Sequence, residues 1–356
     1  MIRYLIADDL TGAADAAVHF AGSRQVEIRI PLPARWGELG GDLPEGDGLT
    51  VFDTESRHLP ADQAAAAVTL ACRGLGEGVF KKVDSTLRGP VAAELEAACL
   101  ALGRSTAVLA PSLPAQGRTV AGGRLLVAGV DAGSVAEILG AAAVVLPVAA
   151  LAGGALAPLV VIDAITDADL ERVASACAGR PDLLPAGSSG LAAAFARLEG
   201  ASAPTAVPAS RRVLVAVASP HVAARAQLAA LAAEPHPAIQ VLAVAAEAQG
   251  LPEELAAALG REVGDRVRDR LPPFRGIPPL RGGETVILAT GGDAALAVCR
   301  ELGIASIRPR AEVLPGVVWS DTGREDVALA TKAGGFGEPR LLLDVALKLL
   351  GMDPHG

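Results

Sequence analysis

Short apolar runs recur along the chain, and most of them are followed by a cluster of polar residues. In the first half these runs cover residues 2–7, 26–30, 49–52, 78–80, 107–110, 159–162 and 182–185. Each has the length and composition of a buried strand. Helices are predicted from the alanine-rich stretches at residues 13–21, 61–75 and 91–102, and from a further stretch that follows residue 190 and ends at residue 199. Strands that alternate with helices indicate an α/β fold with a mainly parallel sheet.

The same alternation resumes after residues 200–210, where small residues and prolines replace the periodic pattern and indicate a linker. Strands are predicted at residues 213–218, 241–244, 285–289 and 327–330. Helices are predicted at residues 220–231, 251–270 and 339–350, with a further helix that follows residue 293 and ends at residue 302, and a loop is predicted at 271–283. A chain of 356 residues also exceeds the length at which one core usually stops growing. We therefore predict two α/β domains, residues 1–205 and 206–356, each a mainly parallel sheet flanked by helices.

Four of the predicted strands in the first domain end in polar residues. The polar segments are Asp8-Asp9-Leu10-Thr11, residues 53–58, residues 81–90 and residues 111–119. Because the carboxyl ends of parallel strands lie along one edge of a sheet, these segments are expected to share one crevice. The alternative for the densest segment, residues 81–90, is a solvated turn capped by Asp84 or Ser85.

The side chains in these segments suit an anionic substrate that carries hydroxyl groups. Arginine forms bidentate pairs with carboxylates and lysine acts as a point charge, so the candidates for holding a carboxylate are Arg57, Lys82, Arg88 and Arg118. Asp8 and Asp9 could orient a hydroxyl, accept its proton or hold Mg²⁺. The alternatives are surface charges for the basic residues and a helix cap for Asp9 or Thr11.

The predicted second domain contains two glycine-rich turns after strands, Thr290-Gly291-Gly292-Asp293 and residues 331–337, the latter containing Lys332. Glycine lets backbone N–H groups approach a phosphate closely, so the turns favour nucleotide binding over plain tight turns. Neither a P-loop nor a dinucleotide-binding fingerprint is present.

Composition makes several classes of function improbable. A net charge of −9 and 3% aromatic residues argue against nucleic-acid binding. Four scattered cysteines predict reduced core residues, and five histidines show no zinc-ligand spacing. With neither a signal peptide nor an apolar run of membrane-spanning length, we expect a cytoplasmic protein without a membrane partner.

Seven motifs in order resemble those of the four-carbon acid sugar kinases, over nearly the whole chain. They are Ile6 to Ala13, Asp53 to Arg57, Lys81 to Gly89, Gly117-Arg118-Thr119, Gly291-Gly292-Asp293, Pro315-Gly316-Val317 and Lys332 to Gly337. The resemblance implies a sugar-acid-binding N-terminal domain and a nucleotide-binding C-terminal domain. It also implies ATP-dependent phosphorylation of threonate, erythronate or a 3-oxo-tetronate, with Mg²⁺ accompanying the ATP.

The resemblance carries over to individual residues. It implies a sugar-acid site formed by Asp8, Asp9, Arg57, Lys82, Asp84, Ser85 and Arg88, in which Asp8, Asp9 and Asp84 are rival candidates for the base. The nucleotide would lie against Ser219, Gly291, Gly292, Asp293, Ala294, Gly316, Gly334, Gly335, Phe336 and Gly337, with Lys332 beside them.

The function predicted from the sequence is therefore an ATP-dependent sugar-acid kinase. The first alternative is a non-catalytic sugar-acid sensor, because Ala216, Val217 and Ala294 depart from the family's pattern near the nucleotide. The second is an esterase or lactonase that uses Ser188 or Ser189. The sequence leaves open which four-carbon acid is the substrate, and whether the protein is a monomer or a homodimer.

Overall fold

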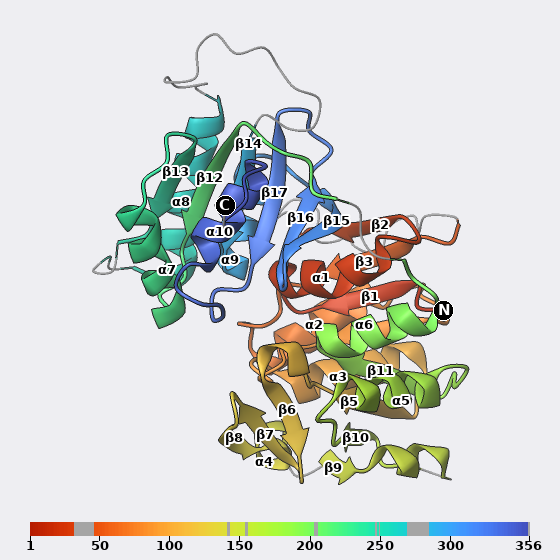
Figure 1. The fold of residues 1–356 in the computed structure, drawn as a ribbon. Coiled ribbons are helices and arrows are strands. Elements are labelled where there is room, and N and C mark those ends of the chain that lie inside the picture. Colours follow the sequence, from red (N-terminus) through yellow and green to blue (C-terminus); the bar gives the residue numbers. More distant parts are fainter. Residues whose placement is uncertain are drawn as a thin grey trace. The chain divides into compact units, whose positions relative to one another are not determined.

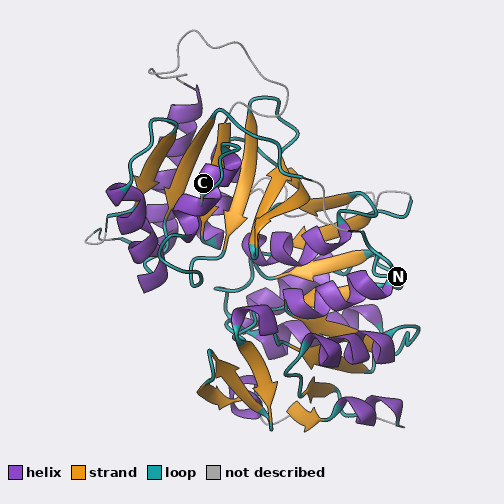
Figure 2. Ribbon diagram, in the orientation of Figure 1, coloured by secondary structure: helices purple, strands orange, loops and turns teal. Residues whose placement is uncertain are grey.

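The computed structural model describes residues 1–31, 46–140, 143–153, 156–202, 206–245, 248, 250–268 and 285–354. The chain divides into two compact units, Met1–Ala203 and Pro204–Gly356. Each contains a sheet flanked by helices, as Figure 2 shows, so the predicted α/β class with two domains is confirmed. The loop predicted at residues 271–283 lies outside the described residues.

The first unit is built on a parallel sheet with the strand order β2-β3-β1-β4-β11-β5-β10-β9 (Figure 1). Its strands are β1 Tyr4–Ala7, β2 Val26–Arg29, β3 Leu49–Asp53, β4 Val79–Lys82, β5 Thr106–Ala110, β9 Ala143–Leu146, β10 Leu159–Ile162 and β11 Leu183–Gly187. The central strands are buried along nearly their whole length and are mostly apolar, apart from Lys81 and Lys82 of β4, as expected when helices cover both faces of a parallel sheet.

The larger helices of the first unit form two groups. The helices of this unit are α1 Leu10–Ala17, η1 Val18–Phe20, α2 Ala61–Ala71, α3 Val91–Leu102, η3 Pro114–Gln116, α4 Val135–Leu139, η4 Val148–Ala152, α5 Asp167–Cys177 and α6 Ser189–Leu198. Helices α2 and α3 pack together, and their residues share a core cluster with Ile6 and Phe52 of the sheet. Helix α6 packs against both α1 and α5.

Two boundaries in the first unit differ from the prediction in ways that concern the polar segments. Helix α1 begins at Leu10 rather than at residue 13, because the Asp9 side chain caps it by accepting from Gly12 N. Strand β4 ends at Lys82 rather than at residue 80, because Lys81 and Lys82 pair with Ile6 and Ala7 of β1. Both lysines therefore belong to the sheet.

A small antiparallel sheet in the first unit was not predicted. It consists of β6 Arg118–Ala121, β7 Arg124–Val127 and β8 Val130–Ser134. Gly122 and Gly123 join β6 to β7 with φ angles of 56° and 72°, the left-handed conformation that two-residue hairpin turns require. The Gly-Gly pair was the signal in the sequence that could have revealed this hairpin.

The second unit is built on a mixed sheet with the order β13-β12-β14-β17-β16-β15. Its elements are β12 Arg212–Val217, α7 Val222–Ala233, β13 Ile239–Ala243, α8 Pro252–Arg268, β14 Thr285–Thr290, α9 Gly292–Glu301, β15 Ser306–Leu314, β16 Val317–Asp321, β17 Val327–Lys332 and α10 Leu341–Leu349. Strands β12, β13, β14 and β17 are parallel, whereas the unpredicted β15–β16 hairpin pairs antiparallel with β17.

The linker predicted at residues 200–210 is described in part. At its end, the Ser210 N–H and hydroxyl groups both donate to the Leu349 carbonyl oxygen, each at 2.8 Å, which fastens the segment to α10. Within the described ranges, no helix is both long and apolar enough to cross a membrane.

Candidate active site

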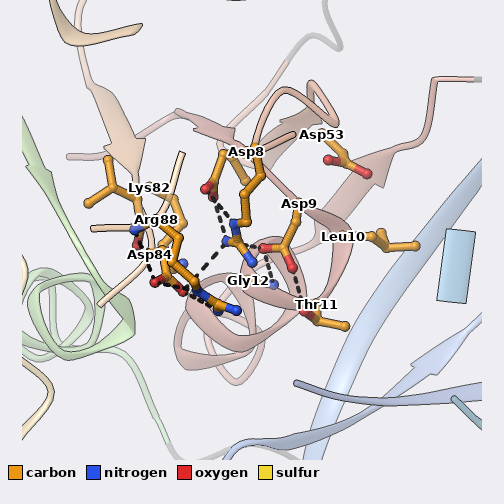
Figure 3. Close-up of polar contacts among 12 residues, drawn as sticks. Asp8, Asp9, Leu10, Thr11, Gly12, Asp53, Lys82, Asp84 and Arg88 are labelled. Carbon is orange, nitrogen blue, oxygen red and sulfur yellow. Dashed lines mark hydrogen bonds and ion pairs between the residues drawn. The ribbon is translucent and has the colours of Figure 1, made fainter. Parts of the chain in front are cut away.

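The predicted gathering of polar strand ends is present in the first unit. Ala7 of β1 pairs with both Asp53 of β3 and Lys82 of β4, so the residues that follow these strands start at the same level of the sheet. Figure 3 shows Asp8, Asp9, Lys82, Asp84 and Arg88 turned toward one another at this edge. The edge brings together the residues that the sequence analysis assigned to the sugar-acid site.

Arg57 forms a buried ion-pair cluster with the two adjacent aspartates. Its Nε and Nη2 atoms donate to both carboxylate oxygens of Asp8, at 2.8 and 2.9 Å, and Nη2 also donates to Asp9 Oδ1 at 2.6 Å. Burial raises the pKa of Asp8, but the attraction of Arg57 and then of Lys82 outweighs it and holds the pKa below its ordinary value. Asp8 is therefore an ionised carboxylate that fixes the guanidinium.

Asp9 has two structural tasks at once. Besides its pair with Arg57, it caps α1, because Oδ1 accepts from Gly12 N at 3.0 Å and Oδ2 accepts from the Thr11 hydroxyl at 2.6 Å. The capping alternative is thus correct for Asp9, while Asp8 makes no such cap. The cap and the ion pair together orient one carboxylate at the start of the helix.

Asp84 is held in the same way by the turn that follows β4. Arg88 donates to its two carboxylate oxygens from Nε at 2.9 Å and from Nη2 at 2.7 Å, and Thr86 N donates at 3.1 Å. Burial raises the pKa of Asp84, but these hydrogen bonds and the charges of Arg57 and Arg88 lower it well below the ordinary range. The alternative of a solvated turn capped by Asp84 or Ser85 is correct for the cap, since Asp84 accepts from Thr86 N, but wrong for the solvation, because both side chains are buried.

Two cations at this edge form hydrogen bonds only with uncharged oxygens. Lys82 is 4% exposed, and its Nζ donates to the Val83 carbonyl oxygen at 2.9 Å. Arg118, at the start of β6, donates from Nη1 to the Ser85 hydroxyl at 2.7 Å, and burial lowers its pKa. In the part of the chain that the structure describes, neither has a carboxylate in ion-pair contact. Both can therefore accept an anionic ligand without losing an internal ion pair.

The backbone of α1 closely approaches Lys82. A methyl group on Gly12 would meet Lys82 Nζ at 2.7 Å and would also collide with Asp9 Oδ1. Glycine at this position therefore leaves room for the lysine ammonium group beside the first turn of the helix.

Ser188 and Ser189 lack the arrangement of a nucleophile. Ser188 caps α6 by accepting from Gly190 N, and its hydroxyl donates to the Ser112 carbonyl oxygen at 2.7 Å. The Ser189 hydroxyl donates its proton to the Asp15 carbonyl oxygen at 2.9 Å rather than to His19 Nε2, which also lies 2.9 Å away. A catalytic base would accept that proton instead, so the geometry speaks against the esterase alternative.

The residues assigned to the nucleotide gather at one edge of the second sheet. Thr290 of β14 pairs with Lys332 of β17, and Lys332 pairs with Val317 of β16, so the turns that contain Gly291, Gly316 and Gly334 lie at the same end. Ser219 follows β12 at this edge, and a methyl group on Gly334 would collide with its hydroxyl. Asp293 and Ala294 open α9 there, and Gly335, Phe336 and Gly337 continue the third turn.

Lys332 is fully buried at the end of β17. Its Nζ donates to the Ala333 carbonyl oxygen at 2.8 Å and lies 4.7 Å from the centre of the Phe336 ring. Burial lowers the pKa of Lys332 to about 8. The protonated form of Lys332 is therefore less stable than that of an exposed lysine, and a nearby anion would stabilise it.

Gln227, which was not predicted from the sequence, holds the glycine-rich turn after β17 in place. Its Nε2 atom lies within hydrogen-bonding distance of the carbonyl oxygens of Phe336, Gly337 and Glu338, at 3.1, 3.0 and 3.1 Å. Gln227 is completely buried on α7. The signal in the sequence was one uncharged polar residue on the apolar face of an alanine-rich helix.

The donor set fits Mg²⁺ only together with a nucleotide. No group of three or more His, Cys, Asp or Glu side chains that could hold a metal lies within the described residues. In the first unit Asp8, Asp9 and Asp84 are paired with arginines, whereas Asp293 stands in the first turn of α9. Protein sites commonly bind Mg²⁺ with one or two carboxylates and the phosphates of the substrate, so Asp293 would suffice as the protein ligand.

Comparison with known proteins identifies the class. The model of a family described as a sugar-binding N-terminal domain matches residues 4–137, and that of a nucleotide-binding C-terminal domain matches residues 275–342. A D-threonate kinase from Bordetella bronchiseptica is 36% identical, with 96% of each chain covered. A 3-oxo-tetronate kinase from Cupriavidus necator is 30% identical, with 97% of this chain and 96% of the relative covered.

A solved structure of a Salmonella typhimurium protein has the same fold, with a TM-score of 0.71 at 22% identity and coverage of 98% and 99%. The chain belongs to the four-carbon acid sugar kinase family. The predicted resemblance is thereby confirmed, and so is the predicted enzyme class, a kinase that transfers a phosphoryl group.

Proposed function

We propose that the protein transfers the terminal phosphoryl group of ATP to a hydroxyl group of a four-carbon sugar acid, with D-threonate as the preferred acceptor. The observation that carries the proposal is the pair of cations without ion pairs, Lys82 and Arg118, beside the ordered cluster of Asp8, Asp9 and Arg57. The choice of D-threonate rests on the relatives named D-threonate kinase, at 36% and 33% identity.

In this proposal the domain of residues 1–205 binds the sugar acid and that of residues 206–356 binds the nucleotide. Lys82 and Arg118 hold the substrate carboxylate, with Ser85 beside them, while Arg57 and Arg88 contribute further N–H groups. Phosphoryl transfer needs positioning and charge compensation more than a strong base.

Among the three candidate carboxylates, we place Asp9 first as the group that accepts the hydroxyl proton. Asp8 and Asp84 have pKa values below their ordinary range, which makes each a weak base. Asp9 is also the N-cap of α1, where it is oriented by Gly12 and Thr11.

For the nucleotide we propose contacts with the glycine-rich turns and with Lys332, and Mg²⁺ held by Asp293 and the phosphates. Support comes from the meeting of Ser219, Gly291 and Gly334 at one edge of the sheet. When bound, Mg²⁺ would neutralise charge on the phosphates. The protein residues would orient the nucleotide and keep its phosphates near the N-terminus of α9.

The test is ADP release with threonate, erythronate and 3-oxo-tetronate, together with calorimetric binding of each acid and of ATP. Arg118→Met and Lys82→Met each remove a charge-assisted contact, so the acid KM should rise by about ten- to hundredfold while the nucleotide KM is kept. Arg124→Met is the matched control, because Arg124 pairs with exposed Asp131 in the same small sheet as Arg118.

Three outcomes would count against the proposal or a part of it. Absence of ADP release with every four-carbon acid would refute kinase activity on this class of substrate. Tight acid binding without nucleotide binding would instead favour the sensor. An acid KM in Arg118→Met equal to that of Arg124→Met would remove Arg118 from the site.

A further inference from the structure

Lys81 and Lys82 are neighbours on β4 and have different surroundings. Lys82 Nζ lies beside Gly12 of α1, at the proposed acid site. Lys81 Nζ lies 2.9 Å from Glu94 Oε2 of α3, with the two side chains 0% and 1% exposed. Successive side chains of a strand point to opposite faces of the sheet, which separates the two lysines. The sequence motif of two lysines therefore contains one residue that cannot contact the substrate.

The Lys81–Glu94 pair belongs to a buried hydrogen-bond network that reaches three strand ends. Lys81 Nζ also donates to the Lys82 carbonyl oxygen at 3.0 Å. The Ser56 hydroxyl, next to Arg57 in the chain, donates to Glu94 Oε1. Ser56 also lies 2.7 Å from the Thr54 hydroxyl, which donates to the Ala7 carbonyl oxygen at 2.7 Å.

Each strand end in this network is followed by, or contains, a residue of the proposed acid site. Ala7 precedes Asp8, Ser56 precedes Arg57, and the tethered carbonyl group belongs to Lys82 itself. A buried ion pair is commonly no more stabilising than apolar residues of the same shape. Stability alone therefore does not account for two buried charges at this position, whereas fixing three strand ends against each other does.

We propose that Lys81 and Glu94, with Ser56, are positioning residues that hold Asp8, Arg57 and Lys82 in the geometry that binds the sugar acid. They act through the backbone and contact neither substrate. This inference rests on the proposed function of the first domain and extends it to residues on the opposite face of the sheet.

The experiment compares Lys81→Met, Glu94→Met and the double variant K81M/E94M with the wild type. Each single variant leaves one buried charge unpaired and should unfold at a markedly lower temperature. The double variant removes both charges and should recover most of the loss in Tm. It should still bind the acid at least tenfold more weakly, with a lower kcat and an unchanged Kd for ATP, because the strand ends are no longer tethered.

A matched pair elsewhere in the same unit provides the control. Arg24 Nη2 lies 2.9 Å from Glu199 Oε2, and Glu199 also lies 3.8 Å from the N-terminal ammonium group, before the start of β1. The double variant R24M/E199M should change Tm and leave acid affinity as in the wild type. Ser56→Ala provides a milder perturbation should K81M/E94M not fold, with an expected loss of acid affinity of a few fold.

Wild-type acid affinity and kcat in K81M/E94M, or in Ser56→Ala where the double variant does not fold, would overturn the inference and leave the pair a structural feature. A wild-type protein that neither binds nor phosphorylates any four-carbon acid would instead refute the proposed function, and this inference with it. An equal loss of acid affinity in the control R24M/E199M would show that any buried substitution disturbs the site, which also overturns the inference.

Discussion

Lys332 allows the proposed nucleotide site to be tested by proton uptake. Burial lowers its pKa to about 8 in the free protein. A bound phosphate beside the ammonium group should return the pKa toward its ordinary value of about 10.4. At pH 9 about one tenth of free Lys332 would be protonated and nearly all of it in the complex, so binding should take up about 0.9 proton.

The same linkage fixes the change in affinity. Between pH 7 and pH 9 the Kd for ATP should increase about tenfold, equivalent to about 1.4 kcal/mol. The terminal phosphate of ATP contributes little to this change, because a phosphate group loses its last proton near pH 6, about one unit below this range. Calorimetry at both pH values, in two buffers with different ionisation enthalpies, measures the affinity and the proton count together.

Two variants provide the comparison. Lys332→Met should lose both the proton uptake and the pH dependence, while Lys348→Met, at the exposed lysine of α10, should keep them. A proton uptake near zero in the wild type, or the same uptake in Lys332→Met, would refute the placement of Lys332 at the phosphates.

The stability of the free protein provides an independent check with a definite sign. The pKa of Lys332 is lower in the folded state than in the unfolded state, so between about pH 8 and pH 10.4 the unfolded chain binds more protons. Stability should therefore rise with pH across this window, by about 3 kcal/mol at most. Lys332→Met should lack the rise and be no less stable than the wild type at pH 7, which separates lost binding from unfolding.

Three further predictions concern positions whose surroundings are equally specific. Gly12→Ala should weaken sugar-acid binding, because the added methyl group would displace Lys82 Nζ and Asp9 Oδ1, and Gly334→Ala should weaken ATP binding, because its methyl group would displace the Ser219 hydroxyl. Titration of each variant with both ligands checks that only the expected affinity falls. Gln227→Leu should raise the KM for ATP severalfold at unchanged acid KM, because three loop carbonyl groups lose their donor; steady-state kinetics decide. Asp53→Asn should stabilise the protein at pH 7 and not at pH 3, because burial and then the charge of Glu55 raise the pKa of Asp53 well above its ordinary value; denaturant unfolding at both pH values measures this.

The sequence predicted the type of each secondary-structure element better than its boundaries. Alternating apolar and alanine-rich stretches were enough for the α/β class and for most strands of both sheets. The end of β4 was wrong because two consecutive lysines suggest a loop, whereas here one is buried against Glu94 and the other beside Gly12. The end of β4 is set by pairing with distant residues of β1, which the local sequence pattern does not reveal.

The gathering of the residues proposed for the acid site could also be predicted, because parallel strands bring their carboxyl ends to one edge. Which of the basic residues are paired with aspartates could not be predicted. Four basic residues were predicted to hold a carboxylate as equals, yet Arg57 and Arg88 are engaged by aspartates and Lys82 and Arg118 are not. The partner of each arginine depends on side-chain distances across loops, for which motif spacing provides no information.

The ion pairs of the two arginines determine which of their atoms can still contact a ligand. Arg57 uses Nε and Nη2 for Asp8 and Asp9, and Arg88 uses Nε and Nη2 for Asp84. Among the described residues, neither Nη1 atom has a hydrogen-bond partner. A guanidinium fixed along one edge presents its remaining N–H groups in a defined direction. The aspartates thus orient these donors before any ligand binds, and in the proposed site Lys82 and Arg118 would supply the charge that the acid neutralises.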